Sequence, residues 1–356
     1  MEVSSISGED ARTESEVVPT PVSPGRKPSG WRQTSLRLAV GGAVTAGFLW
    51  LFLRQADLGE TWREMHALPG WSIAAALGFV LANAAFIALR WRYLFAAARY
   101  STTARGLFPI YCVGAAANNI IPARGGDLLR LGAARQHYKI PAFVTAGTLF
   151  AERLLDGVVL SVWILMGALM IGETGPLLLA GVGLSAGTTV GVVLAALMAA
   201  RPDTAERFVW RVTGWLPERW HMKIGRATAN FVLGLGAFRQ RRSLLRVAWT
   251  SVAIWLADFG MYVVVGKGFG IDLGVGAYFL LEGVGNLALG VPATAAGLGS
   301  FDYLTLVSAQ QLDVAENLAT PYVLTVHAMV VLPVTILGAI LLLNVFPRLL
   351  GRSATP

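Results

Sequence analysis

Two apolar stretches of this chain are each too short to cross a membrane as a helix, and each ends at a break rich in Gly and Pro. The first, residues 106–121, runs into NNIIPARGGDLLR at 118–130; the second, residues 276–291, runs into NLALGVPATAAGLGSFD at 286–302. A bilayer core about 30 Å thick takes about 20 apolar residues to cross. We therefore expect both stretches to stop inside the membrane, and paired breaks of this kind in two halves point to a transporter's binding site.

The composition is that of an integral membrane protein, with 55% hydrophobic residues, 14% charged residues and a mean hydropathy of +0.58. The net charge of +8 is also found in nucleic-acid-binding proteins. In a membrane protein, however, basic residues gather in cytoplasmic loops and near anionic lipids, so we predict no nucleic-acid partner. The single cysteine, Cys112, excludes an internal disulfide. Because no metal-ligand spacing, P-loop, dinucleotide fingerprint or nucleophile elbow is present, we predict no metal, no cofactor and no catalytic motif.

The N-terminal residues 1–35 carry charges of both signs and four prolines, with few large apolar residues. We expect them to form a disordered cytoplasmic tail. A transmembrane domain is expected over 36–348, followed by a short cytoplasmic tail, 349–356. Its membrane helices are expected over the apolar runs 36–53, 71–89, 141–171, 176–200, 247–266 and 320–346.

The distribution of basic residues predicts the orientation. Residues 90–105 carry four arginines and no acid, and residues 123–140 carry four basic residues against one acid, so both ends of the first short stretch are expected in the cytoplasm. The linkers 172–175 and 313–317 contain no Lys or Arg and are expected outside. The loop 201–246 has ten basic residues, three acids and interspersed tryptophans, which predicts amphipathic helices on anionic inner-leaflet lipids. Both termini would be cytoplasmic, in a cell inner (plasma) membrane.

With these orientations, the segments of two halves, about 71–171 and 247–346, correspond one to one. Each segment of one half crosses the membrane in the direction opposite to its counterpart. The predicted fold is therefore all-α, a polytopic transmembrane helical bundle with two re-entrant, broken-helix hairpins in an inverted repeat. Backbone of this kind is tolerated only where it is buried in protein or lines a wet cavity. The alternative is that two Gly/Pro kinks, which are common in membrane helices, coincide by chance.

The first break holds most of the candidate substrate-binding residues: Asn119, Pro122, Arg124, Gly125, Gly126, Asp127 and Arg130. Arg124 and Arg130 offer bidentate donors that suit a phosphate. Asp127 lies three residues before Arg130, so the two can pair on a helix. The alternative interpretation is a helix start with an acid in its first turn, followed by positive-inside arginines.

The next helix contains ERLLD, which places Glu152, Arg153 and Asp156 within a membrane-length segment. Ionisable groups there are costly unless they face a cavity or one another. A proton relay or a headgroup cradle is one interpretation. A purely structural network, for example between Arg153 and Asp127, is the other.

The second half adds the candidates Glu282, Pro292, Gly297, Gly299 and Asp302. Glu282 and Asp302 flank the second break, and we expect them to line the cavity. For the isolated polar groups Asn83, Asp258 and His327 we expect hydrogen bonds to a neighbouring helix.

The motifs N-x-x-P-x-R-x-G-[ED]-x-x-R, E-R-x-x-D and P-x-x-x-x-G-L-G-x-x-[ED], in this order, resemble the lysylphosphatidylglycerol synthase transmembrane, or flippase-like, family over about 71–346. They are carried here by Asn119, Pro122, Arg124, Gly126, Asp127 and Arg130, by Glu152, Arg153 and Asp156, and by Pro292, Gly297, Gly299 and Asp302. Two departures are Asp127 and Asp302, where Glu is more usual, and Ala296, which replaces a common Gly.

The resemblance implies a membrane region that moves a lipid between leaflets. In two-part members a separate soluble domain makes the aminoacylated phospholipid, and we expect none here because ten residues follow 346. Stand-alone relatives are associated with hopanoid or glycolipid pathways, which leaves the cargo open. We therefore expect a lipid translocase rather than an enzyme, with a membrane lipid as substrate; a homo-oligomer is compatible with the sequence. The alternatives are a membrane-bound transferase that acts on a lipid-linked substrate with a carboxylate as general base, or a scaffold whose partner docks on 201–246.

Overall fold

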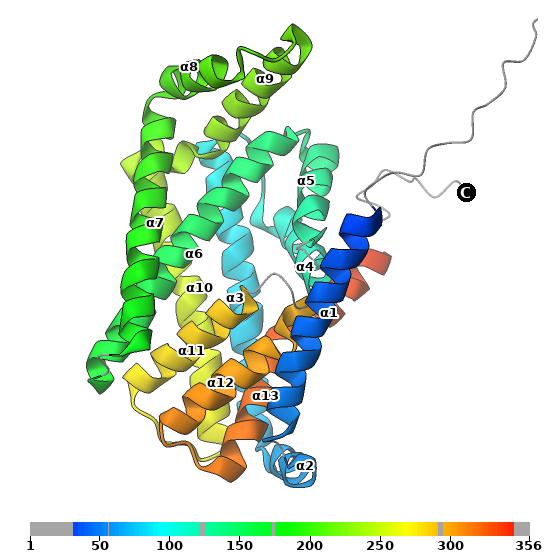
Figure 1. Ribbon diagram of the computed structural model, residues 1–356, viewed down its shortest axis with the longest axis vertical. Helices are drawn as coiled ribbons and strands as arrows, with labels where there is room; N and C mark the ends of the chain where they lie inside the picture. Colours follow the sequence, from blue (N-terminus) through cyan, green and yellow to red (C-terminus); the bar gives the residue numbers. More distant parts are fainter. Residues whose placement is uncertain (1–30, 56, 122–124, 173–174, 291–294, 345–356) are drawn as a thin grey trace, which may run out of the picture.

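The computed structural model describes residues 31–55, 57–121, 125–172, 175–290 and 295–344, all of whose regular structure is helical (Figure 1). This confirms the predicted all-α class. Five of the helices in this part of the chain are long and apolar enough to cross a membrane: α3 (Gly70–Ala97), α6 (Ala142–Ile171), α7 (Pro176–Ala200), α10 (Arg241–Gly268) and α13 (Glu316–Asn344).

The outer helices present apolar side chains to their surroundings, as membrane helices do. On α7 the exposed side chains include Leu179, Val190 and Leu197, with exposed fractions of 69%, 58% and 53%. Its inner face buries small residues, Ala195 and Ala199, against the bundle. A helix that is apolar on its exposed face as well as on its buried one suits a lipid environment, so the fold is that of a multi-pass membrane protein.

Both predicted breaks are present as helical hairpins. The first joins α4 (Ala104–Ile120) to α5 (Gly125–Tyr138), and the second joins α11 (Val275–Leu289) to α12 (Ser300–Gln311). These helices have 17, 14, 15 and 12 residues, so each is shorter than a membrane span. The predicted binding residues Pro122, Arg124 and Pro292 lie outside the described residues.

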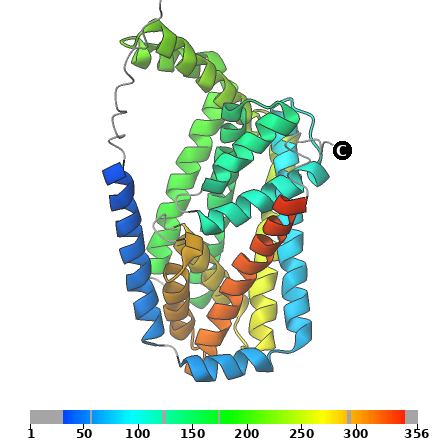
Figure 2. The same cartoon turned by 90° about the vertical axis from the view of Figure 1, so that its right-hand side faces the viewer.

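The two halves pack around an antiparallel pair, α3 and α10. Ser72 Oγ donates to the carbonyl oxygen of Val264 (2.8 Å), and Asn83 Nδ2 donates to that of Ile254 (3.0 Å), so the numbering rises on one helix as it falls on the other. Next to this pair, α4 packs against α13, and α11 packs against α6 (Figure 2). These pairings exchange when α3–α6 and α10–α13 are exchanged, an arrangement compatible with the predicted inverted repeat, which stays a prediction. The side from which each hairpin enters the membrane remains a prediction.

The buried core follows the same division. One cluster of buried side chains includes Trp91 and Phe95 of α3 and Leu107 of α4, and another includes Tyr262 of α10 and Phe301 of α12. Trp91 and Tyr262 are each the twenty-second residue of their helices, α3 and α10, so the two half-cores are built around aromatic side chains in corresponding places.

Several elements differ from the sequence expectation. Helix α1 (Trp31–Leu53) begins inside the expected tail, and it packs against α12, where Gly299 lies close to it. The expected linker 54–70 contains a helix, α2 (Leu58–Ala67), whose first turn is capped by the Asp57 carboxylate. The basic loop 201–246 forms the amphipathic helices α8 (Pro202–Thr213) and α9 (Glu218–Gly234), a 3-10 turn η2 (Gly236–Arg239) and the start of α10.

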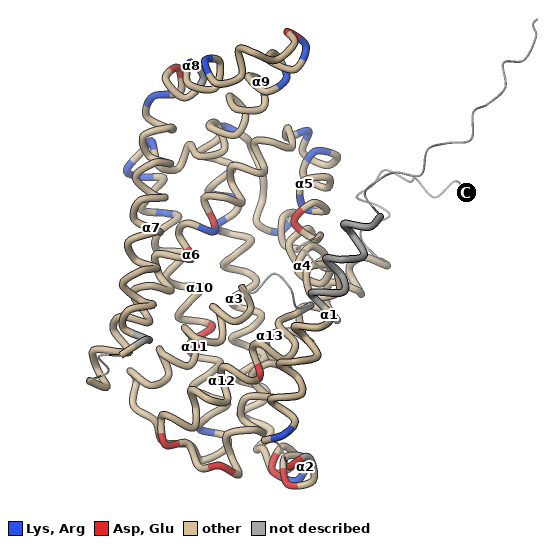
Figure 3. The backbone as a smooth tube through the Cα atoms, viewed as in Figure 1, with Lys and Arg blue, Asp and Glu red and all other residues tan. Residues whose placement is uncertain are grey.

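Charge is distributed unequally between the two ends of the bundle. Lys and Arg gather at the end that carries α8, α9 and the C-terminal end of α5, whereas Asp and Glu predominate at the end with α2 (Figure 3). This is the distribution from which the positive-inside rule predicted the orientation.

The close contact between α4 and α5 yields a stability prediction. A Cβ on Gly126 would lie 1.9 Å from the carbonyl oxygen of Gly114, a backbone atom that cannot turn away. We expect Gly126→Ala to destabilise the protein by about 1–3 kcal/mol, the usual range for overpacking a tight contact. Thermal unfolding of the purified protein in detergent measures this.

Gly132, further along α5, is the matched control, because a Cβ there would meet nothing within 4 Å. Gly132→Ala is expected to leave the midpoint unchanged or raise it, since Ala favours a helix over Gly by about 0.5–1 kcal/mol. Equal losses for the two substitutions would contradict the close approach of α4 and α5.

Candidate functional site

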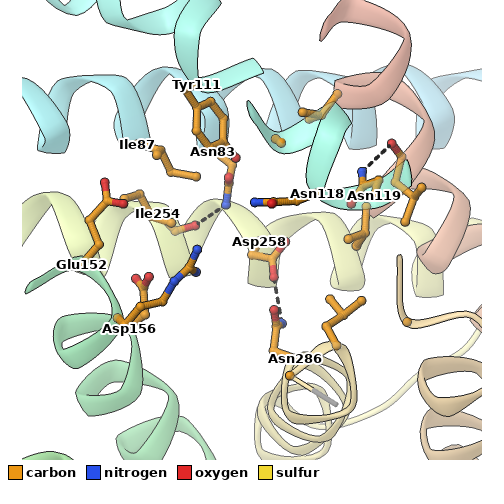
Figure 4. A pocket seen from close by; sticks show the side chains of 18 of the residues that line it. Asn83, Ile87, Tyr111, Asn118, Asn119, Glu152, Asp156, Ile254, Asp258 and Asn286 are labelled. Atoms are coloured by element: carbon orange, nitrogen blue, oxygen red, sulfur yellow. Dashed lines mark hydrogen bonds between the residues drawn. The ribbon is translucent and has the colours of Figure 1, made fainter. Parts of the chain in front are cut away.

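A cavity of about 500 Å³ lies between the ends of the two hairpins (Figure 4). Ile121 at the end of α4 lines it, as do Leu289 and Gly290 at the end of α11 and Gly297 in the 3-10 turn η3 (Ala295–Gly297) that precedes α12. Helices α3, α6, α10 and α13 complete the wall. The volume falls within the range of about 300–1,000 Å³ that small-molecule sites occupy. The two breaks, far apart in sequence, therefore meet at one cavity.

The wall of this cavity is unusually polar for the interior of a membrane bundle. Its charged and amide side chains are Asn83, Arg90, Asn118, Asn119, Arg130, Glu152, Arg153, Asp156, Asp258 and Asn286. Figure 4 shows Glu152 and Asp156 on α6 across the cavity from Asn118 and Asn119 on α4. No group of three or more His, Cys, Asp or Glu side chains in the described part of the chain is arranged to hold a metal ion. The chemistry of the wall is thus that of amides and ion pairs.

Arg130 of α5 is bound to Glu152 of α6. Its Nη2 donates to both carboxylate oxygens, at 3.2 and 3.0 Å, and both side chains are almost completely buried. The guanidinium carbon also lies 4.2 Å from the centre of the Trp91 ring. A buried charge is tolerated when it is paired and hydrogen-bonded in this way. Arg130, predicted as a phosphate donor, is therefore engaged by the protein itself.

Asp127 connects the first break to α6. Its carboxylate lies 3.5 Å from Arg153 Nη2 and 3.8 Å from Arg130 Nη1. Asn118 Nδ2 donates to the same carboxylate (3.1 Å), while the Asn118 side-chain oxygen accepts from the Asp127 backbone N–H (3.2 Å). The contact between Arg153 and Asp127 is the structural pairing that the sequence left as an alternative. It is also a loose one, because 46% of the Arg153 side chain is exposed.

Arg90 is a site residue that sequence reasoning missed. It was assigned to an arginine-rich membrane interface, but its guanidinium is buried and bound to both carboxylate oxygens of Asp156, at 2.5 and 3.2 Å. Trp255 Nε1 also donates to Asp156 (3.2 Å), and Arg90 donates to Ser251 (3.1 Å). The available signal was spacing, since Arg90 follows Asn83 by seven residues and so lies on the same face of α3.

Two candidates of the second half do not line this cavity, contrary to expectation. Glu282 is fully buried within α11. Asp302 lies behind the turn, where it accepts from the Gly299 backbone N–H (2.9 Å) and contacts His327 Nδ1 (2.6 Å). The reason is that α11 is buried on nearly every side, so its apolar sequence gave no sign of which face meets the cavity.

The second half contributes Asp258 and Asn286 instead. Asn286 Nδ2 donates to the Asp258 carboxylate (3.1 Å), and both side chains line the cavity. The expectation of hydrogen bonds to neighbouring helices is confirmed for Asn83, Asp258 and His327. Asn119, expected to approach a ligand, donates to Thr335 Oγ1 of α13 (2.8 Å) while bordering the cavity.

The glycines of the two breaks allow close contacts or backbone angles that residues with a side chain rarely permit. Gly126 provides the contact between α4 and α5, and Gly125 lies against Ile121. Gly297 and Gly299 have φ angles of 74° and 81°, which side-chain-bearing residues rarely adopt. Ala296, which stands where a Gly is common, also has a positive φ of 52°.

Comparison with known proteins decides the family. Residues 38–338 match the family described as the lysylphosphatidylglycerol synthase TM region. The chain belongs to this family. It is also 28% identical over 303 residues to a curated protein of Haloferax volcanii named glycosyltransferase AglD, a match that covers 75% of this chain and 48% of the relative. The chain thus spans about half the length of that relative. No solved structure matches the chain.

The pair formed by Arg90 and Asp156 gives a second prediction. Asp156→Leu leaves a buried guanidinium without its counter-charge, and we expect a loss of about 3–5 kcal/mol in the free energy of unfolding. The double substitution Arg90→Met, Asp156→Leu removes both charges and is expected to lose less than Asp156→Leu alone. Chemical or thermal unfolding of the three proteins in one detergent gives the comparison.

The pair formed by Lys267, in the last turn of α10, and Asp272, after that helix, is the control, because both side chains are exposed. The hydrogen bond and charge of Lys267 lower the pKa of the Asp272 carboxyl, yet the Asp272 side chain is 89% exposed. Lys267→Met is expected to change stability little. If the double variant were as unstable as Asp156→Leu, the unpaired charge of buried Arg90 would not be the cause of the lost stability.

Proposed function

We propose that this protein moves a phospholipid or a related polar lipid between the two leaflets of a membrane. The observation that carries the proposal is that two broken-helix hairpins from opposed halves border one polar cavity inside an otherwise apolar bundle. Binding sites at the interface of two repeats, built from broken helices, are characteristic of membrane transporters. Membership of the lysylphosphatidylglycerol synthase TM family supports a lipid-related role.

The headgroup is proposed to bind at the first break. Arg153 is the described arginine best suited to meet it, since its side chain is 46% exposed and its hydrogen bond to Asp127 is long, 3.5 Å. Arg124 of the same break would add a second guanidinium. Arg130 would act indirectly, because its pairing with Glu152 holds α5 against α6. Guanidinium groups suit phosphate, and the neighbouring amides suit hydroxyl or amine groups of a headgroup.

The acyl chains are proposed to remain outside the cavity. Ile121, on the cavity wall, is 46% exposed, so the cavity reaches the molecular surface at the end of α4. Ile120 beside it is 66% exposed, which continues the apolar surface outward. A lipid could thus place its headgroup among the polar side chains while its chains stay on apolar helix faces.

The basic end of the bundle is proposed to face the cytoplasm of a cell inner membrane, with both termini on that side. On α8 and α9, Phe208, Trp210 and Trp220 have exposed fractions of 68%, 44% and 49%. Exposed aromatic side chains among arginines favour binding to anionic lipids of the inner leaflet.

A transferase that acts on a lipid-linked substrate is the second candidate, favoured by the name of the Haloferax relative. Asp258 would be its general base, because among the described carboxylates on the cavity wall it is the one without an ion pair. Incubation of the purified protein with radiolabelled nucleotide-sugars and polyprenyl phosphate tests this. Transfer of label that Asp258→Asn abolishes would establish the transferase, and no transfer would leave translocation as the function.

Filling the cavity should stop lipid movement. Ala115 of α4 lines the cavity, and Ala115→Phe places a ring there without changing any charge. In proteoliposomes with fluorescent phosphatidylglycerol, scored by dithionite quenching, we expect Ala115→Phe and Arg153→Ala each to slow movement at least about tenfold, which corresponds to about 1.4 kcal/mol of barrier.

Two variants control for folding and charge. Ala115→Ser adds one atom at the same place and is expected to retain the rate. Arg135→Ala removes a basic residue of α5 that does not border this cavity, and it should also retain the rate. Wild-type movement no faster than in protein-free liposomes, or unaffected by Ala115→Phe, would contradict translocation through this cavity.

A further inference from the structure

A buried histidine fastens the turn of the second hairpin. His327 of α13 places Nδ1 2.6 Å from the Asp302 carboxylate and Nε2 2.9 Å from the carbonyl oxygen of Ala296. The Phe301 ring lies over the imidazole, with 4.6 Å between ring centres, and the His327 side chain is 7% exposed. Ala296 belongs to η3 and borders the cavity. One side chain thus connects α13 to α12 and to the cavity wall.

A neutral imidazole and an ionised carboxylate carry one proton too few to make both contacts of His327. A carbonyl oxygen can only accept, so Nε2 must carry a hydrogen. A neutral imidazole has one ring N–H, which leaves Nδ1 as a lone pair opposite an ionised carboxylate oxygen. The contact of 2.6 Å therefore needs a second proton, either on Nδ1 or on the Asp302 carboxyl. In either case, His327 and Asp302 together hold one more proton than a neutral imidazole and an ionised carboxylate.

The first hairpin has an arginine in the corresponding place. Asp127 and Asp302 are each the third residue of their helices, α5 and α12, and Arg153 and His327 are each the twelfth of theirs, α6 and α13. Both carboxylates contact the side chain of the matching helix. Arg keeps its charge at all physiological pH values, whereas His gains and loses a proton near neutrality. The same contact is therefore permanent in one half and proton-dependent in the other.

We propose that His327 and Asp302 form a proton-binding site that holds the second hairpin's turn closed, and that loss of this proton frees the turn at the cavity wall. The role of this site in coupling proton binding to lipid passage rests on the proposed function. After the proton leaves, the neutral ring can donate to Asp302 or to Ala296, but not to both. The positive φ of Ala296 adds strain that favours release of the turn.

The surroundings make Asp302 the charged partner of this site. Helix α13 packs against α2, α3, α4, α10 and α12, and in the described part of the chain the one charged side chain that acts on His327 is Asp302 from α12. The remaining polar contact of the ring is the Ala296 carbonyl from η3. Proton loss at this pair is thus not compensated by a second ionisable neighbour.

A buried cysteine at the turn can report its opening without any lipid movement. Ser300, the first residue of α12, is fully buried, and Ser300→Cys in a Cys112→Ala background changes little volume. Ala134→Cys, fully buried in the first hairpin, is the reference for thiol ionisation. The ratio of the N-ethylmaleimide labelling rates at Ser300→Cys and Ala134→Cys, followed by mass spectrometry, is expected to rise about tenfold or more from pH 6 to pH 9.

Two substitutions separate proton binding from simple packing. In Asp302→Asn the amide accepts from Gly299 N–H and donates to Nδ1, so the contact needs no extra proton and the ratio should stay low at every pH. His327→Ala removes the contact, and the ratio should be high at every pH. A ratio in the native pair that does not change with pH, or an equal rise in Asp302→Asn, would overturn the proposal. Because labelling is independent of lipid transport, failure of the translocase function would leave this result interpretable.

Discussion

The buried arginines Arg90 and Arg130 are each held by a carboxylate on another helix, and the arrangement of the hairpins depends on these pairings. Arg130 joins α5 to α6 through Glu152, and Arg90 joins α3 to α6 through Asp156. In a membrane interior an unpaired guanidinium is costly, so these contacts restrict how the helices can pack. The consequence is a polar cavity whose wall is cross-linked by two buried ion pairs.

The two halves differ in how their buried charged side chains are paired. The first half uses arginines and carboxylates around its break, with Asp127 between Arg130 and Arg153. The second half uses fewer charges, with Asp258 bound by Asn286 on the wall and Asp302 bound by His327 behind it. A repeat with one strongly cationic end and one weakly charged end suits a transporter that binds an anionic group at one hairpin and lets it pass the other.

Much of the fold could be predicted because its signals are local. Apolar run length and Pro/Gly breaks predicted the five long spans and the short helices α4 and α11, and the spacing of Asp127 and Arg130 predicted their contact. Contacts across helices could not be predicted in this way. Arg90 sits in an arginine-rich segment typical of a membrane interface, and only the packing of α3 against α6 and α10 reveals that it is buried. Glu282 lies four residues before Asn286, which does line the cavity, so helical spacing alone could not predict that Glu282 stays out of it.

In the proposed function a lipid headgroup occupies the cavity between the two hairpins. Photo-crosslinking of the reconstituted protein with a phosphatidylglycerol that carries a diazirine on its headgroup tests this occupancy most directly. Peptide mapping should place crosslinks at the end of α4 and around Arg153 of α6, and Ala115→Phe should remove them. Crosslinks confined to α8 and α9, or unchanged in Ala115→Phe, would show that lipid binds the surface of the bundle and not this cavity.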